Sequence, residues 1–99
     1  MPFSTLEPHD ILLVDDSEAD ARLFETALRD ASSRARTYWV ATATEAIEFL
    51  EQRGRFQNAG PVKIVVLDLH LPRQNGFDAL RQIKSNPDVS RTPVVVLSA

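Results

Sequence analysis

The chain has 99 residues, of which 43% are hydrophobic and 25% are charged, a composition typical of one small globular domain. The 11 basic and 14 acidic residues give a formal net charge of −3, which argues against a nucleic-acid-binding surface. Cysteine is absent, and this excludes disulfides, thiol nucleophiles and Cys-ligated metals. No apolar run approaches the ~20 residues of a membrane span and no signal-peptide pattern is present, so we expect no membrane partner and a cytoplasmic location.

Strand and helix patterns alternate along the chain after an irregular lead-in at residues 1–9. Apolar and β-branched runs predict strands at residues 11–14, 37–41, 63–67 and 94–97. Helical patterns predict helices from Ser17 to about Ser32, from Thr44 toward Gly54, and from Asn75-Gly76 to just before Asn86-Pro87.

The helices carry predicted caps and buried faces. Ser17 should cap the first helix, with Asp20 three residues later, and Thr44 should cap the second, which Gly54 helps to end. The residues expected on the buried faces are Leu23, Ala27 and Ala31, widened by Phe24 and Leu28, then Ala46, Ile47 and Leu50, and finally Phe77, Leu80 and Ile83.

This alternation predicts a single α/β domain over residues 1–99. Its strands should form a doubly wound parallel sheet with right-handed crossovers and helices on both faces. Ligands of such sheets bind outside the carboxyl ends of the strands, where the strand order reverses. Functional residues are therefore expected at the strand ends.

Acidic side chains occur at two of these ends. Asp15 and Asp16 follow residues 11–14, Asp68 follows residues 64–67, and Ser98 follows the last predicted strand. Neighbouring carboxylates repel one another unless a hard cation neutralises them, and Mg²⁺ prefers such oxygen ligands. Asp68 could bind the metal or attack phosphorus, and the Ser98 hydroxyl could donate to a phosphoryl oxygen. Alternatively, Asp15 and Asp16 are turn residues that interact with a helix dipole.

These motifs resemble a response-regulator receiver domain through nearly the whole chain. Leu13-Val14-Asp15-Asp16-Ser17 resembles the acidic pocket of that family. Residues 68–76 resemble its phosphoacceptor loop, and residues 96–99 its fourth strand with a switch hydroxyl. Residues 16–20 and 86–88 also look like single-domain regulators that serve bacterial phytochromes and related histidine kinases.

The resemblance implies a signalling protein of flavodoxin-like fold, and not an enzyme. A histidine kinase, such as a phytochrome-like one, or a small phosphodonor would phosphorylate Asp68. Mg²⁺ would be held by Asp16, by Asp68, by Asp15 through water and by the backbone carbonyl of His70. The remaining implied site residues are Ser98 as the switch hydroxyl and Leu71, Pro72 and Gly76 in the phosphoacceptor loop.

The chain also departs from the family pattern. Receivers continue through a fourth helix, a fifth strand that ends in a catalytic Lys, and a fifth helix, so the resemblance is to a C-terminally truncated receiver. Lys63 and Lys84 fall on the third predicted strand and helix and cannot replace that Lys. A truncated or degenerate receiver that binds partners without phosphotransfer is therefore the alternative function.

Residues 94–97 are apolar at consecutive positions and would form an exposed sheet edge. We expect apolar surface on both faces of the sheet to be uncovered, and self-association through this edge.

Two other protein classes would need residues that this chain lacks, and three residues of the second predicted strand region have ordinary structural explanations. An Asp-nucleophile phosphatase would need an Asp where His70 stands, and a flavin- or nucleotide-binding domain would need a glycine-rich first loop. Tyr38 and Trp39 are interpreted as strand packing, and Arg36 as a solvated charge.

Overall fold

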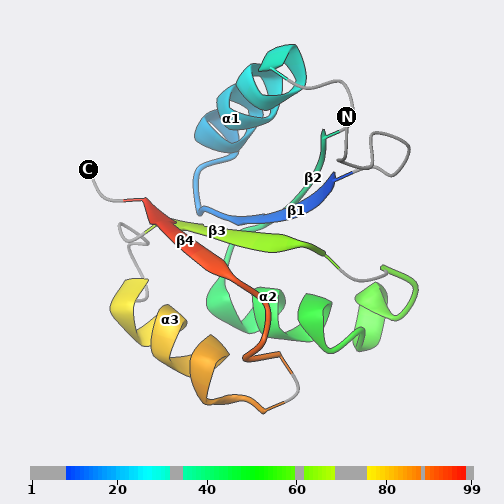
Figure 1. Cartoon of the computed structure of the whole chain (residues 1–99), viewed down its shortest axis with the longest axis vertical. Helices are drawn as coiled ribbons and strands as arrows, with labels where there is room; N and C mark the ends of the chain where they lie inside the picture. The colour runs from blue at the N-terminus through cyan, green and yellow to red at the C-terminus, as the bar shows by residue number, and fades with distance from the viewer. Residues whose placement is uncertain (1–8, 32–34, 60–61, 69–75, 88, 98–99) are drawn as a thin grey trace, which may run out of the picture.

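The computed structural model describes residues 9–31, 35–59, 62–68, 76–87 and 89–97. Its elements follow the predicted alternating order (Figure 1). They are β1 (His9–Val14), α1 (Glu18–Ala31), β2 (Ala35–Val40), α2 (Ala43–Leu50), the 3₁₀ turn η1 (Gly54–Phe56), β3 (Ile64–Asp68), α3 (Gly76–Ser85) and β4 (Val94–Leu97). The predicted lead-in lies outside the described residues, apart from His9, which begins β1.

The described strands form a parallel sheet in the order β2-β1-β3-β4. This confirms the predicted doubly wound α/β fold. The chain moves from β1 to β2 on one side and then crosses to β3 on the other, so the strand order reverses between β1 and β3. In the register of the sheet, Leu13 of β1 lies beside Trp39 of β2 and Val66 of β3.

Helices cover both faces of the sheet, with α1 on one side and α2 and α3 on the other (Figure 1). On the α1 side, Leu13 and Val66 pack with Ala21 and Phe24. The larger cluster on the other side joins alternate strand residues to α2 and α3, and its buried members are Leu12, Val14, Val40, Ala43, Ala46, Phe49, Val65, Leu67, Ala79, Ile83 and Val89. The consecutive apolar residues of β1 and β3 thus supply both cores, as expected for strands buried on both faces.

The predicted buried stripe of α1 is wrong at its centre, although its two widening residues, Phe24 and Leu28, do face the sheet side. Ala21 is buried and Phe24 and Leu28 are half-buried, whereas Leu23 is 70% exposed. Ala27 and Ala31 are exposed as well. Ala21, Phe24 and Leu28 are three and four residues apart, so they share one helix face, and the exposed Leu23 lies outside it.

The predicted boundaries of α2 need two corrections. Thr42, not Thr44, is the N-cap, with an extended backbone and its Oγ1 3.1 Å from the Glu45 amide that donates to it. The helix ends at Leu50, before Gly54, and Gln52 and Gly54 both adopt a left-handed backbone with φ of 58° and 59°. Gly54 begins the 3₁₀ turn that follows.

The two faces of strand β4 differ in exposure, although apolar surface was expected to be uncovered on both. Val95 and Leu97 are 43% and 41% exposed, whereas Val94 and Val96 are half-buried. Val95 lies beside Val66, so the exposed side chains are on the face that carries α1. The exposed apolar surface of β4 therefore belongs to one face and not to both.

Within the ranges that the structure describes, none of the helices has the length and apolar character needed to cross a membrane.

Candidate functional site

Three predicted acidic residues converge at the carboxyl edge of the sheet. Asp15 and Asp16 follow β1, and Asp68 is the last residue of β3, the strand paired with β1. One carboxylate oxygen from each lies within 4.8 Å of those of the other two. Asp15 is buried, Asp68 is half-buried and Asp16 is exposed, so the cluster opens to solvent on one side.

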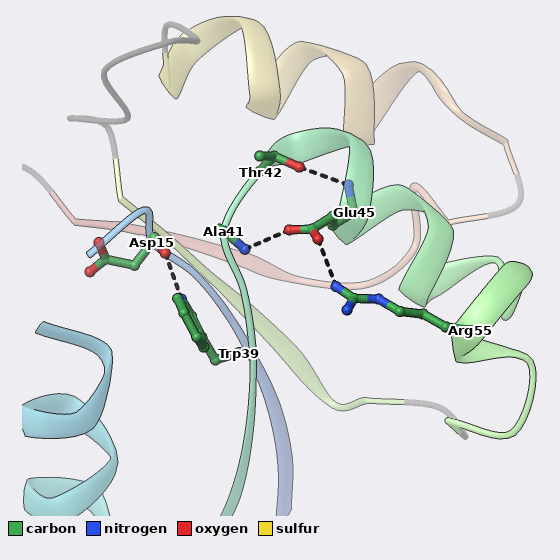
Figure 2. Close-up of polar contacts among 6 residues, drawn as sticks. All are labelled: Asp15, Trp39, Ala41, Thr42, Glu45 and Arg55. Carbon is green, nitrogen blue, oxygen red and sulfur yellow. Dashed lines mark hydrogen bonds and ion pairs between the residues drawn. The ribbon is translucent and has the colours of Figure 1, made fainter. Parts of the chain in front are cut away.

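Asp15 is held by contacts to both its backbone and its carboxylate. Its N–H donates to the Val40 carbonyl at 3.1 Å, and its own carbonyl accepts from the indole Nε1 of Trp39 at 2.6 Å (Figure 2). The Ser17 N–H donates to Asp15 Oδ1 at 2.9 Å. These contacts fix the direction in which the chain leaves β1.

Helix α1 starts directly after this acidic pair. Ser17 Oγ accepts from the Asp20 amide at 3.2 Å, which confirms the predicted cap. The positive end of the helix dipole therefore lies next to the acidic residues and offsets part of their repulsion.

The electrostatics of the cluster favour a cation. Burial raises the pKa of the Asp15 carboxyl above its usual range, and the negative charges of Asp68, Asp20 and Asp16 raise that pKa further. The hydrogen bond from Ser17 acts in the opposite direction but does not cancel the rise in pKa. A divalent cation would remove the repulsion among the carboxylates.

The donor set fits a hard metal ion. All three side chains offer carboxylate oxygens, which suit Mg²⁺ and Mn²⁺ rather than metals that prefer thiolate or imidazole. Three oxygens are fewer than an octahedral ion requires, which leaves positions for water, a backbone carbonyl and a phosphoryl oxygen.

The other predicted site residues are placed less fully. His70, Leu71, Pro72 and Ser98 lie outside the described residues, and Gly76 is the first residue of α3. Lys63 immediately precedes β3 at the opposite edge of the sheet. Lys84 Nζ donates to the carbonyls of Ser90 and Thr92 at 3.1 and 3.0 Å, before β4 begins. Both lysines therefore lie at the end of the sheet where the strands begin, away from the acidic cluster where the strands end.

The sequence interpretation missed two contacts. Trp39 was expected only to pack, but the residue is 41% exposed and its indole N–H reaches the Asp15 carbonyl. Arg36 was expected to be a solvated charge, but its Nε donates to Asp10 Oδ1 at 2.9 Å. An aromatic residue next to the end of β2 was the available signal, but the register between β1 and β2 is needed to interpret it.

The fold and the site define a doubly wound α/β protein with an acidic centre at the point where the strand order reverses. A sequence model of the response regulator receiver domain matches residues 11–99, and the chain belongs to that family.

Several known proteins are similar to the chain. Response regulator Rcp1 from Synechocystis sp. is 40% identical over 91 residues, which cover 92% of this chain and 62% of Rcp1. The chain therefore spans less than two thirds of the length of this relative.

Two solved structures share the fold. The structure of the phosphorylated cyanobacterial phytochrome response regulator RcpA superposes with a TM-score of 0.80 at 40% identity, over 92% of this chain and 65% of RcpA. The Mn²⁺-bound form of Rcp1 gives a TM-score of 0.79 at 40% identity, over 92% of this chain and 66% of that one.

Proposed function

We propose that this chain is the phosphoacceptor of a two-component phosphorelay, with Asp68 as the phosphorylated residue and a bound Mg²⁺ ion. The observation that carries the proposal is the convergence of the Asp15, Asp16 and Asp68 carboxylates at the switch point of a receiver sheet. Membership of the receiver family and the Mn²⁺-bound form of the related Rcp1 support it.

In the proposed reaction an Asp68 carboxylate oxygen attacks the phosphorus of a phosphohistidine in line with the leaving imidazole. The O–P bond of an acyl phosphate forms while the P–N bond breaks, and the freed imidazole keeps the electron pair of that bond and takes up a proton. Asp16, Asp68, the His70 carbonyl and, through water, Asp15 would hold Mg²⁺. When bound, the ion supplies neutralisation of the charge on the phosphoryl oxygens.

The remaining predicted residues have roles in signalling. The Ser98 hydroxyl would donate to a phosphoryl oxygen and shift the equilibrium from the inactive to the active form. Leu71, Pro72 and Gly76 would shape the loop that presents Asp68.

We propose a sensor histidine kinase of phytochrome type as the partner, in the cytoplasm. The support is the likeness to RcpA, a phytochrome response regulator whose structure was solved in the phosphorylated form. Self-association is proposed through the edge of β4, where Val95 and Leu97 are exposed.

Phosphorylation with a small phosphodonor such as acetyl phosphate, or with a kinase, tests the function. The chain should acquire phosphate that hydroxylamine releases, as an acyl phosphate does. Asp68→Asn should abolish this incorporation, whereas Asp15→Asn, which leaves the nucleophile in place, should only weaken it. Labelling of Asp68→Asn at the level of the unchanged chain would refute the assignment of Asp68.

A protein-interaction module without phosphotransfer is the second candidate function. It is favoured by the positions of Lys63 and Lys84, which lie at the amino ends of the strands, away from Asp68, and so cannot serve as a catalytic Lys there. The phosphorylation assay should be run on this chain and on a version extended past Ala99. Absence of hydroxylamine-labile phosphate from both versions would favour the interaction module.

A further inference from the structure

Trp39 connects an edge strand to the acidic cluster through one hydrogen bond. It is the single Trp of the chain, and it lies one residue before the end of β2. Its indole Nε1–H donates to the backbone carbonyl of Asp15 at 2.6 Å, as Figure 2 shows. The contact spans 24 residues of sequence, so it is tertiary and not part of a local turn.

The last two residues of β2 hold both backbone polar groups of Asp15. Val40 accepts from its N–H at 3.1 Å, and Trp39 donates to its carbonyl. The peptide bond from Asp15 to Asp16 is therefore fixed on its oxygen side by a side chain. The direction of this peptide decides where the Asp16 carboxylate can point.

Such fixing matters at this site because the carboxylates repel one another. Asp15, Asp16 and Asp68 have oxygens within 4.8 Å of one another, and without restraint the loop would relax to separate the charges. A binding site that is already ordered loses less conformational entropy when its ligand binds.

We propose that Trp39 is a positioning residue of the cation site. Its indole N–H holds the Asp15 carbonyl and thereby orients the Asp15–Asp16 segment, so that removal of this N–H weakens binding of a divalent cation although Trp39 is not a ligand. The inference rests on the proposed function because it concerns the same metal site.

The expected effect is that of one lost hydrogen bond, a roughly three- to tenfold weaker affinity for Mg²⁺. Trp39→Phe keeps an aromatic ring and removes the donor. Replacement of Trp39 by 3-benzothienylalanine, in which sulfur takes the place of the indole N–H, keeps the shape of the whole bicyclic ring. Thr37→Val is the matched control. Thr37 and Trp39 both line a groove between α1 and β2, but Thr37 makes none of the described contacts to Asp15.

Binding should be measured by titration with MgCl₂, with the backbone amide of Asp16 and the Trp39 indole N–H followed by NMR. In the unchanged chain both signals should shift with the same midpoint. A loss of fold stability alone would leave the midpoint of the folded protein unchanged, so a raised midpoint reports on the geometry of the cation site. Trp39→Phe and the sulfur analogue have no indole N–H, so their midpoint is read from the Asp16 amide and should be raised, while Thr37→Val should leave both midpoints in place.

The outcomes separate the two proposals. If the unchanged chain shows no shift at millimolar Mg²⁺, the metal site of the proposed function fails, and the role of Trp39 with it. If the unchanged chain binds Mg²⁺ and the sulfur analogue binds with equal affinity, the N–H has no positioning role and only the present inference is overturned. The sulfur analogue decides the matter even if Trp39→Phe does not fold.

Discussion

Among the residues that the structure describes, Asp15 is the charged residue that is buried, with 7% of its surface exposed. A carboxylate in this position stabilises the fold less than a neutral side chain would, because burial and neighbouring negative charges oppose its ionisation. The Ser17 amide satisfies one of its oxygens but supplies no full positive charge. Asp15 is therefore better suited to binding a cation than to stabilising the metal-free protein.

We expect Asp15→Asn to stabilise the metal-free protein at neutral pH, on the order of 1 kcal/mol. Asn keeps the oxygen that accepts from Ser17 and removes the charge. The pKa of Asp15 is raised in the folded state, so folding favours the protonated form. That contribution is complete below the ~3.9 of an unfolded Asp and is lost as the pH rises through the raised value. The difference between the proteins should thus appear above this window and vanish below it.

Urea denaturation between pH 3 and 8 measures this effect, and Mg²⁺ provides the control. Saturating Mg²⁺ should stabilise the unchanged chain more than Asp15→Asn, because the variant offers one charge fewer to the ion. A variant less stable than the unchanged chain in the absence of metal would contradict this account of Asp15.

The acidic centre could be predicted from the sequence because parallel strands place their carboxyl ends at one edge. Asp15, Asp16 and Asp68 each end or follow a strong apolar run, so local patterns were sufficient. The contact from Trp39 could not be predicted in this way, because it depends on which residues of β1 and β2 lie side by side. The roles of His70 and Ser98 stay predictions.

At the level of the elements, α2 is anchored by a side-chain network at its first turn. Thr42 Oγ1 accepts from the Glu45 amide, and Glu45 in turn accepts from the Ala41 N–H at 2.9 Å (Figure 2). Arg55, from the 3₁₀ turn, donates to the same Glu45 carboxylate at 2.6 Å. The network ties both ends of the α2 region together. The sequence does contain a signal for this cap, because Thr42-x-x-Glu45 has the spacing of a capping box and Thr44 has no Glu or Gln three residues later.

Thr42→Ala should lower the free energy of unfolding by about 1 kcal/mol, within the ~0.5–2 kcal/mol range measured for lost N-caps. Thr44→Ala is the matched control, because Thr44 is exposed inside the helix and Ala has the higher helix propensity. Chemical denaturation of both variants measures the difference. Equal destabilisation by the two substitutions would show that Thr42 does not act as the cap.

Over the whole molecule, the two edges of the described sheet differ. Edge strand β2 carries Arg36, whose charge is paired with Asp10, and such charges discourage pairing with a further strand. Edge strand β4 has no charged residue, and it exposes Val95 and Leu97 on the face that α1 covers elsewhere. The alternating pattern predicted this topology, but which apolar residues stay exposed depends on how far α1 extends across the sheet.

The 99-residue chain should therefore self-associate through β4 and not through β2. Each ~100 Å² of apolar surface that association removes from water contributes roughly 2–3 kcal/mol, before the cost of association is subtracted. Light scattering should show a mass that rises with protein concentration, and the midpoint of thermal unfolding should rise with it.

Two single substitutions test which edge is involved. Val95→Lys places a charge on the exposed face of β4, where it would be desolvated on pairing, and should return the chain to a monomer. Thr37→Lys places the same charge on β2 and should leave the association unchanged. Because β4 pairs with β3 through Val65–Asp68, a second copy can add only along its other side. A monomeric chain with a sharp, concentration-independent transition would show that the described core is sufficient and that this edge needs no partner.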